Sequence, residues 1–201
     1  MWLRTFVVAS VLVLAAPSIA YRDGEPEGFS MRLVRAGVER TNHRVTYDGS
    51  YRSIPYPNGD VPSNIGVCTD LVIRAYRALG IDLQQDVHEE MKAHFAAFPN
   101  NWGLRRPDPN IDHRRVLNLQ VLFSRKGIVL PVTANPEDYA AGDLVTWVLP
   151  GNLPHIGIVA HQKSPDGRRP LIVHNIGRGP QLEDMLFTYP ITGHYRYYGL
   201  R

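Results

Sequence analysis

Hydrophobic positions recur with a helical period in the first half of the chain and with a strand period in the second. The clearest helical pattern covers residues 67–79, where apolar side chains form one stripe and charged side chains lie opposite. Gly80 suits the left-handed residue that ends a helix, and Ser63 or Asn64 could cap its start. This segment is therefore predicted to be a helix with Cys68 in its first turn.

Three more segments show helical periodicity, namely residues 29–40, 83–97 and about 112–126. Four later segments have strand character and are bounded by turn residues: 143–148, 155–161, 171–176 and 194–198. Helices first and strands later are typical of an α+β protein. We expect N-terminal helices packed on a C-terminal antiparallel β-sheet.

The first twenty residues have the composition of a secretory signal peptide. Arg4 gives a positive start, an apolar stretch covers residues 5–16, and Ser18 and Ala20 are the small residues that signal peptidase requires. The apolar stretch is shorter than the roughly 20 residues that span a bilayer, although an uncleaved anchor is the alternative. We expect a signal peptide over residues 1–20, a single domain over residues 21–201, and a periplasmic or secreted protein with no stable membrane anchor.

Charge narrows the range of partners. The chain has 22 Lys and Arg residues against 19 Asp and Glu residues, and no dense run of basic residues. Such a balance argues against nucleic acid as a partner. We expect a monomer without a cofactor.

The single cysteine, Cys68, is the first candidate for chemistry. A lone cysteine in an exported protein is an inert buried thiol, an intermolecular partner or a reactive group. A helix N-terminus lowers the pKa of a thiol and offers free N–H groups to an oxyanion, which favours the reactive group. Asp70, two residues later, would oppose ionisation of the thiol unless it points elsewhere.

Two histidines on neighbouring predicted strands are candidate partners for Cys68. His155 opens one strand on the same face as Gly157, and closing the hairpin at residues 164–169 brings Gly157 opposite His174. His155 then lies within side-chain reach of His174, whereas a slip of one residue would separate them. The pattern predicts a nucleophile, a base and a third group that orients the base.

Several sequence blocks resemble known families. The blocks GVCTDLV (66–72), AGDLV (141–145) with HIGIV (155–159), and VHN (173–175) resemble, in the same order, the motifs of NlpC-type cell-wall peptidases. The segments WGLRRPDPNIDHRR (102–115), HNIG (174–177) and ITGHYRY (191–197) resemble a bacterial family called domain of unknown function 1287. The family name assigns no function, so the NlpC resemblance is the one that implies a mechanism.

That resemblance implies a papain-like fold and an exported cysteine hydrolase that cleaves amide bonds, with peptidoglycan stem peptides as substrate. Cys68, His155 and His174 would be catalytic. The candidates for substrate binding are Tyr56, Trp102, Arg106, Asp108 and Asn175. For the arginine-rich loop, residues 105–115, a solvated loop and a carboxylate-binding loop remain equally open.

Two other functions remain open. The strand histidines His155, His174, His161 or His194 could bind zinc together with Asp143, although no close-spaced ligand motif supports this. The chain could also be a non-catalytic wall-binding module on the same scaffold, because a fold does not fix a function.

Overall fold

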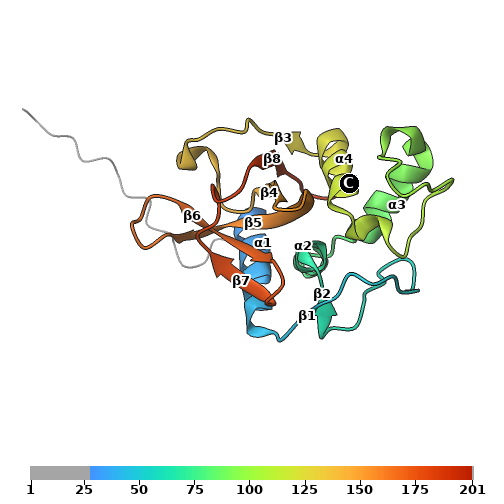
Figure 1. Ribbon diagram of the computed structural model, residues 1–201, viewed down its shortest axis with the longest axis horizontal. Coiled ribbons are helices and arrows are strands. Elements are labelled where there is room, and N and C mark those ends of the chain that lie inside the picture. Colours follow the sequence, from blue (N-terminus) through green and yellow to red (C-terminus); the bar gives the residue numbers. More distant parts are fainter. Residues whose placement is uncertain (1–27, 201) are drawn as a thin grey trace, which may run out of the picture.

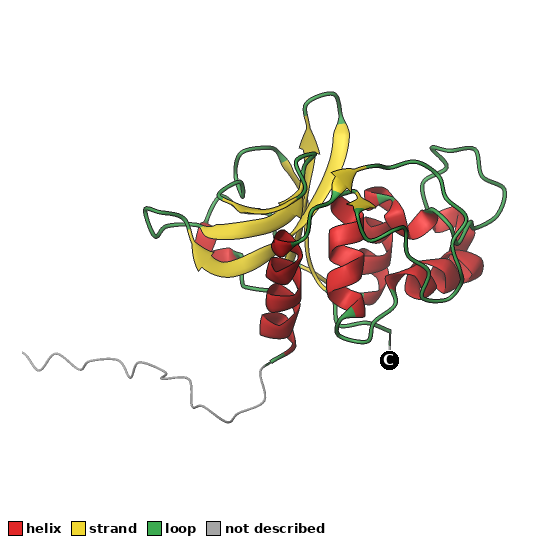
Figure 2. Ribbon diagram, turned by 90° about the horizontal axis from the view of Figure 1, so that it is seen from below, coloured by secondary structure: helices red, strands yellow, loops and turns green. Residues whose placement is uncertain are grey.

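The computed structural model of the protein describes residues 28–200, in which helices lie on one side and a β-sheet on the other (Figures 1 and 2). The expected α+β class, with N-terminal helices packed on a C-terminal antiparallel sheet, is confirmed. The predicted signal peptide lies outside the described residues. No helix within residues 28–200 is long and apolar enough to cross a membrane.

The helices follow the predicted segments closely. They are α1 (Phe29–Glu39), α2 (Cys68–Arg77), α3 (Leu83–His94) and α4 (Val116–Lys126), with 3-10 turns η1 (Arg40–Asn42), η2 (Phe95–Ala97), η3 (Asp112–Arg114) and η4 (Pro136–Asp138). Gly80 adopts the left-handed conformation expected after α2, with a φ of 81°. The helix predicted over residues 112–126 starts later than expected, at Val116, because its first residues form the separate turn η3.

The sheet has six strands in the order β3-β8-β4-β5-β6-β7, and all pairs are antiparallel. Its strands are β3 (Ile128–Val129), β4 (Leu144–Leu149), β5 (Leu153–Lys163), β6 (Pro170–Asn175), β7 (Pro180–Glu183) and β8 (Ile191–Arg196). A short parallel pair, β1 (Thr46–Tyr47) with β2 (Ile65–Gly66), stands apart. The sequence missed β1, β2, β3 and β7, since two to four residues are too few to show an alternation.

The sheet buries side chains on both faces. On one face Ile156, Ile158 and Val173 join the main core with the helices, and on the other Val145 and Trp147 pack in a smaller core. His155 and Gly157 alternate with Ile156 and Ile158 along β5, as the sequence predicted.

The start of α2 is held by a buried ion pair that the sequence did not reveal. Arg114 in η3 donates to both carboxylate oxygens of Asp70, at 2.8 and 2.9 Å, and both side chains are almost fully buried. Arg114 also donates to the carbonyls of Asp48 and Ser50, which ties the loop after β1 to the helix. The ion pair therefore fixes three separate segments around the first turn of α2.

The predicted N-caps of α2, Ser63 or Asn64, are wrong. The residue before the helix is Val67, which has no polar side chain, and neither Ser63 nor Asn64 lies at the helix start. Instead the Asp70 carboxylate reaches back and accepts the Val67 N–H at 2.7 Å. One carboxylate thus supports the helix start and pairs with Arg114, which explains why Asp70 stands so close to Cys68.

Substitution of one member of this ion pair should destabilise the protein strongly. We expect Asp70→Asn or Arg114→Met to lower the free energy of unfolding by about 3 to 5 kcal/mol, because each leaves a buried group without its partner. The double variant should cost less than the sum of the two single variants. Urea unfolding measures all three.

The matched control is Asp184→Asn, which breaks the half-exposed pair between Asp184 and Arg169. That change should cost about 1 kcal/mol or less, since solvent screens the pair. If Asp70→Asn cost no more than this control, the buried pair would not hold the helix start.

Candidate functional site

The thiol of Cys68 lies at the first residue of α2, against the sheet. Its side chain is buried, with 4% of the residue exposed, and its sulfur accepts the backbone N–H of Ile156 in β5. Because Ile156 directly follows His155, this hydrogen bond places the nucleophile candidate beside the strand position of the base candidate. The α2 start thus meets β5 at the residue that follows His155.

His155 and His174 are in direct contact. His155 Nε2 lies 3.0 Å from His174 Nδ1, and both residues are 1% exposed. His174 Nε2 lies 3.0 Å from the carboxylate of Glu183 in β7. The two histidines that the sequence paired therefore form a hydrogen-bonded line that ends at a carboxylate.

The register behind this contact agrees with the prediction, because Gly157 pairs with His174. A side chain at Gly157 would collide with β6: its Cβ would lie 2.6 Å from Ile172 Cγ2 and 3.2 Å from His174 Cβ. Glycine at this position therefore allows β6, the strand that carries His174, to approach β5 closely.

The thiol and the imidazole are both neutral near pH 7. Burial raises the pKa of Cys68 to about 11; the N–H groups of Ile156 and Thr69 lower it in part, whereas Asp70 raises it further. Burial and the neighbouring His174 lower the pKa of His155 to about 3. The helix start was expected to lower the pKa of the thiol, but the cost of removing a thiolate from water is larger here.

Tyr47 is a site residue that the sequence analysis missed. Its hydroxyl hydrogen-bonds the sulfur of Cys68 and also accepts the backbone N–H of Cys68. Burial and the thiol raise the pKa of Tyr47 above its ordinary value. The strand that carries it has two residues, which are too few to show a periodicity in the sequence.

The other predicted site residues fall into different places. Asn175 is buried and bridges the backbone, since its Nδ2 donates to Gly66 O at 3.4 Å and its Oδ1 accepts the Gly177 N–H. This contact positions the segment before Cys68 and leaves Asn175 without the exposed surface that substrate binding requires.

Tyr56, Arg106 and Asp108 gather near one surface hollow of about 730 Å³. Arg106 and Asp108 line it together with Arg105, whereas Tyr56 borders it through an edge contact with His88 and donates to Glu89 at 2.6 Å. Asp108 is engaged by the Tyr51 hydroxyl at 3.1 Å. The arginine-rich loop is therefore divided, because Arg105 and Arg106 face the hollow while Arg114 is buried.

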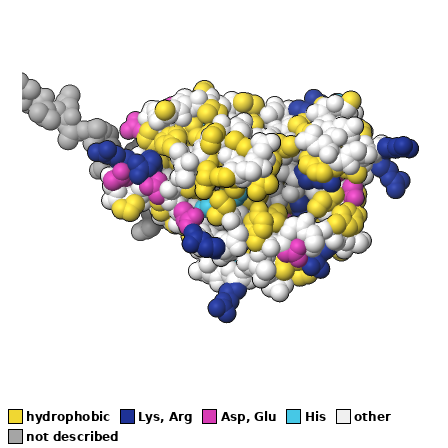
Figure 3. All heavy atoms as spheres, viewed as in Figure 1, with side chains coloured by type: hydrophobic (Ala, Val, Ile, Leu, Met, Phe, Trp, Pro, Cys, Tyr) yellow, Lys and Arg dark blue, Asp and Glu magenta, His cyan; other side chains and the backbone are white. Residues whose placement is uncertain are grey.

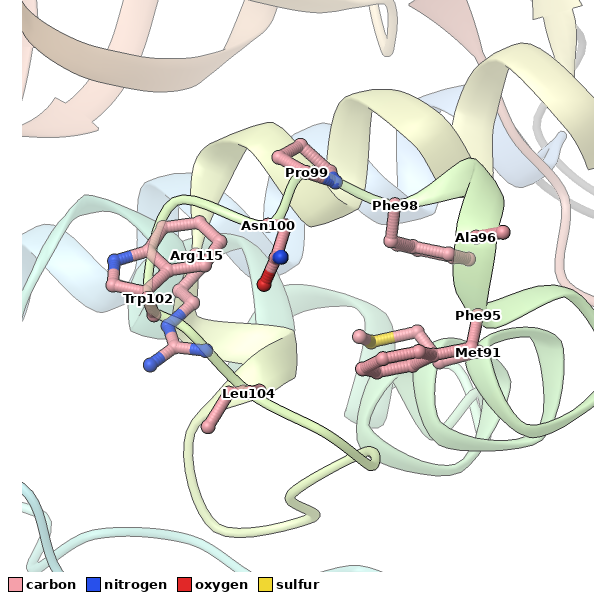
Figure 4. Close-up of a pocket in the computed structure, with 9 residues that line it drawn as sticks. All are labelled: Met91, Phe95, Ala96, Phe98, Pro99, Asn100, Trp102, Leu104 and Arg115. Carbon is pink, nitrogen blue, oxygen red and sulfur yellow. The ribbon is translucent and has the colours of Figure 1, made fainter.

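Trp102 separates two further cavities. One, of about 280 Å³, lies between α3 and the following loop; Figure 4 shows Trp102 and Arg115 on one side of it and Met91 and Phe95 on the other. The Arg115 guanidinium lies 4.0 Å from the centre of the Trp102 ring. The second cavity, of about 460 Å³, is lined by Trp102, Trp147 and Pro154, and the centre of the Trp147 ring lies 5.9 Å from that of His155. Figure 3 shows histidine surface near the middle of one face, among hydrophobic side chains.

Comparison with known families identifies the family of this chain. The family model described as "Domain of unknown function (DUF1287)" matches residues 34–197. The chain belongs to the DUF1287 family. The match covers the thiol, both histidines and all five predicted substrate-binding residues, so the expected family membership is confirmed.

Relatives of this DUF1287 chain do not name an activity. The "Uncharacterized protein YijF" of Escherichia coli (strain K12) is 53% identical over 169 residues, which cover 84% of this chain and 82% of that protein. Among solved structures, "Structure of NlpC1 from Trichomonas vaginalis" is similar with a TM-score of 0.46 and 16% identity. That alignment covers 88% of this chain, which spans about half the length of NlpC1 (48%).

The histidines considered for zinc are not assembled in one place. His194 and Asp143 pair with each other at 2.9 Å, away from the line of His155 and His174, and His161 is exposed. Within the part of the chain that the structure describes, no group of three or more His, Cys, Asp or Glu side chains is arranged to hold a metal ion.

The neutral thiol predicts a particular pH dependence of alkylation. We expect the rate at which iodoacetamide modifies Cys68 to rise about tenfold per pH unit from about pH 7 to about pH 10, because the thiolate is the reactive form. The rise follows from a pKa near 11, well above this range. Alkylation is read by mass, and the single cysteine makes the signal specific.

Urea-unfolded protein is the control, and its thiol should titrate at about 8.5. A rate in the folded protein that is already flat below about pH 7 would mean a thiolate–imidazolium pair and would contradict the neutral resting state.

Proposed function

We propose that this DUF1287 protein is an exported cysteine hydrolase of amide bonds, with peptidoglycan stem peptides as its substrate. The observation that carries the proposal is that the Cys68 sulfur accepts the N–H of Ile156, the residue that follows the base candidate His155 in β5, and that His155 is hydrogen-bonded to His174. A nucleophile, a base and an orienting group on three elements form the arrangement used by papain-like hydrolases. Export rests on the predicted signal peptide.

The reaction follows from these roles. As the Cys68 sulfur forms a bond to the substrate carbonyl carbon, its proton moves to His155, and the carbonyl oxygen takes the negative charge. The protonated His155 then gives the proton to the departing amine as the C–N bond breaks, which leaves an acyl-enzyme. Water, deprotonated by His155, attacks the acyl carbon and restores the thiol when the acid leaves.

The resting state imposes a condition on the first step. Since the thiol and His155 are both neutral, proton transfer has to accompany attack and does not precede it. The negative charge on the carbonyl oxygen needs donors, and the backbone N–H of Cys68 is the candidate at the helix start. Tyr47 occupies that N–H in the resting state, so the tyrosine hydroxyl would shift toward the substrate oxygen during attack.

Two hollows offer places for substrate. The cavity of about 460 Å³ is lined by Trp102 and Trp147, which suits an apolar or sugar-like group. The larger hollow is lined by Arg105 and Arg106, which suits a carboxylate. One stretch of chain, which begins at Tyr47 in β1, reaches both the thiol and this hollow. Tyr47 contacts Cys68, and Tyr51, four residues later, lines the hollow. Stem peptides supply both amide bonds and carboxylates.

Removal of the nucleophile or the base should abolish hydrolysis. On purified peptidoglycan we expect the wild type to release peptide fragments, Cys68→Ala to release none, and His155→Ala to lose at least about a hundredfold in rate. Mass spectrometry of the soluble fraction identifies the fragments and the bond cleaved.

The matched control is His161→Ala, an exposed histidine of the same strand β5, which should retain the wild-type rate. Activity should also survive a chelator. A protein that binds sacculi but releases nothing, with or without Cys68, would refute the hydrolase and favour the non-catalytic module.

Loss of the arginine in the larger hollow should weaken substrate binding. We expect Arg106→Ala to raise KM about tenfold with little change in kcat, because a charge-assisted hydrogen bond distant from the scissile bond stabilises substrate and transition state alike. Arg168→Ala, an exposed arginine in the turn between β5 and β6, is the control and should leave KM unchanged. Unchanged KM in both variants would remove Arg106 from the substrate site.

A further inference from the structure

We propose that Glu183 is a positioning residue of this site, which acts through His174 to make Nδ1 of His155 the atom that takes the Cys68 proton. The inference rests on the proposed function and deepens it. Glu183 lies in β7, whose pairing with β6 places its carboxylate 3.0 Å from His174 Nε2.

The contact with Glu183 fixes which ring nitrogen of His174 carries the proton. Its Nε2 lies 3.0 Å from the Glu183 carboxylate, and an ionised carboxylate has acceptors only. His174 must therefore carry its proton on Nε2 to make this bond. Burial keeps the imidazole of His174 neutral, since its pKa is lowered although Glu183 opposes that shift. A neutral ring protonated on Nε2 leaves Nδ1 as an acceptor.

The tautomer of His174 in turn fixes the tautomer of His155. His174 Nδ1, now an acceptor, lies 3.0 Å from His155 Nε2, so that nitrogen must donate. His155 is also neutral, because its pKa lies near 3. Its Nδ1 therefore has a free lone pair. The Glu183 carboxylate, which contacts His174 and not His155, thus selects the tautomer of the base.

The surroundings of Glu183 fit this role. One carboxylate oxygen faces His174 and the other lies 3.3 Å from the Arg178 guanidinium, so both oxygens are oriented. The side chain of Glu183 is 34% exposed and lines a hollow of about 470 Å³ that includes His174 and Tyr189 but not the thiol. The neighbouring Asp184 turns elsewhere and pairs with Arg169 at 2.7 and 2.9 Å.

The experiment measures the tautomers directly and needs no substrate. In protein with ¹⁵N-labelled histidine, ring nitrogens are assigned with His155→Ala and His174→Ala. We expect a protonated Nε2 and an unprotonated Nδ1 on both rings in the wild type. In Glu183→Ala we expect His155 to become a mixture of tautomers, because His174 has lost the acceptor that fixes it. A protonated Nδ1 on wild-type His155 would overturn the proposal.

The kinetic arm separates positioning from folding. We expect Glu183→Ala to lower kcat about 10- to 100-fold with KM unchanged, and Glu183→Gln to keep most of the activity, because its amide oxygen still accepts the Nε2–H of His174. Asp184→Asn is the matched control, with wild-type kcat and wild-type tautomers. Equal losses in the Ala and Gln variants, or unaltered tautomers in Glu183→Ala, would refute the role of Glu183.

The two proposals fail in different ways. Wild-type protein with the stated tautomers but no hydrolysis would refute the hydrolase and leave the His–His–Glu line intact. Hydrolysis that depends on Cys68 and His155 but is indifferent to Glu183→Ala would refute the positioning role alone.

Discussion

The site depends on the buried ion pair between Asp70 and Arg114. Asp70 holds the start of α2, and Arg114 binds the loop that follows Tyr47 through two backbone carbonyls. Thr69, next to the nucleophile candidate, also donates to the Arg114 carbonyl at 3.0 Å. The helix, the loop and η3 therefore share one polar centre, and no single one of them could move without leaving charge unpaired in the core.

This arrangement explains why a carboxylate is tolerated two residues from a thiol. The charge of Asp70 raises the pKa of Cys68, which opposes the formation of a nucleophile. That charge is balanced by Arg114, and the carboxylate satisfies the Val67 N–H that would otherwise be left free at the helix start. Asp70 therefore fixes the helix start and the position of the Cys68 sulfur, but it also makes the thiol less acidic.

The sequence predicted the parts of the site that depend on local pattern. The helix around Cys68 was visible from its apolar stripe, and the contact between His155 and His174 followed from alternation and from the turn between the strands. Tyr47, Arg114 and Glu183 were missed because each acts through a contact that no local sequence pattern shows. Tyr47 and Glu183 stand on strands of two and four residues, and the burial of Arg114 depends on Asp70, 44 positions earlier.

The pKa of Cys68 is raised and the pKa of His155 is lowered, and both shifts affect how the site would work. Both shifts come mainly from burial, so both depend on the site being closed to water. A substrate that brings its carbonyl to the sulfur also brings a polar oxygen into this dry region. Negative charge can form on that oxygen only where hydrogen-bond donors are already oriented toward it. Charge separation between Cys68 and His155 is therefore coupled to the presence of the bound carbonyl. Such coupling would keep the Cys68 thiol unreactive until substrate arrives, because oxidation also proceeds through the thiolate.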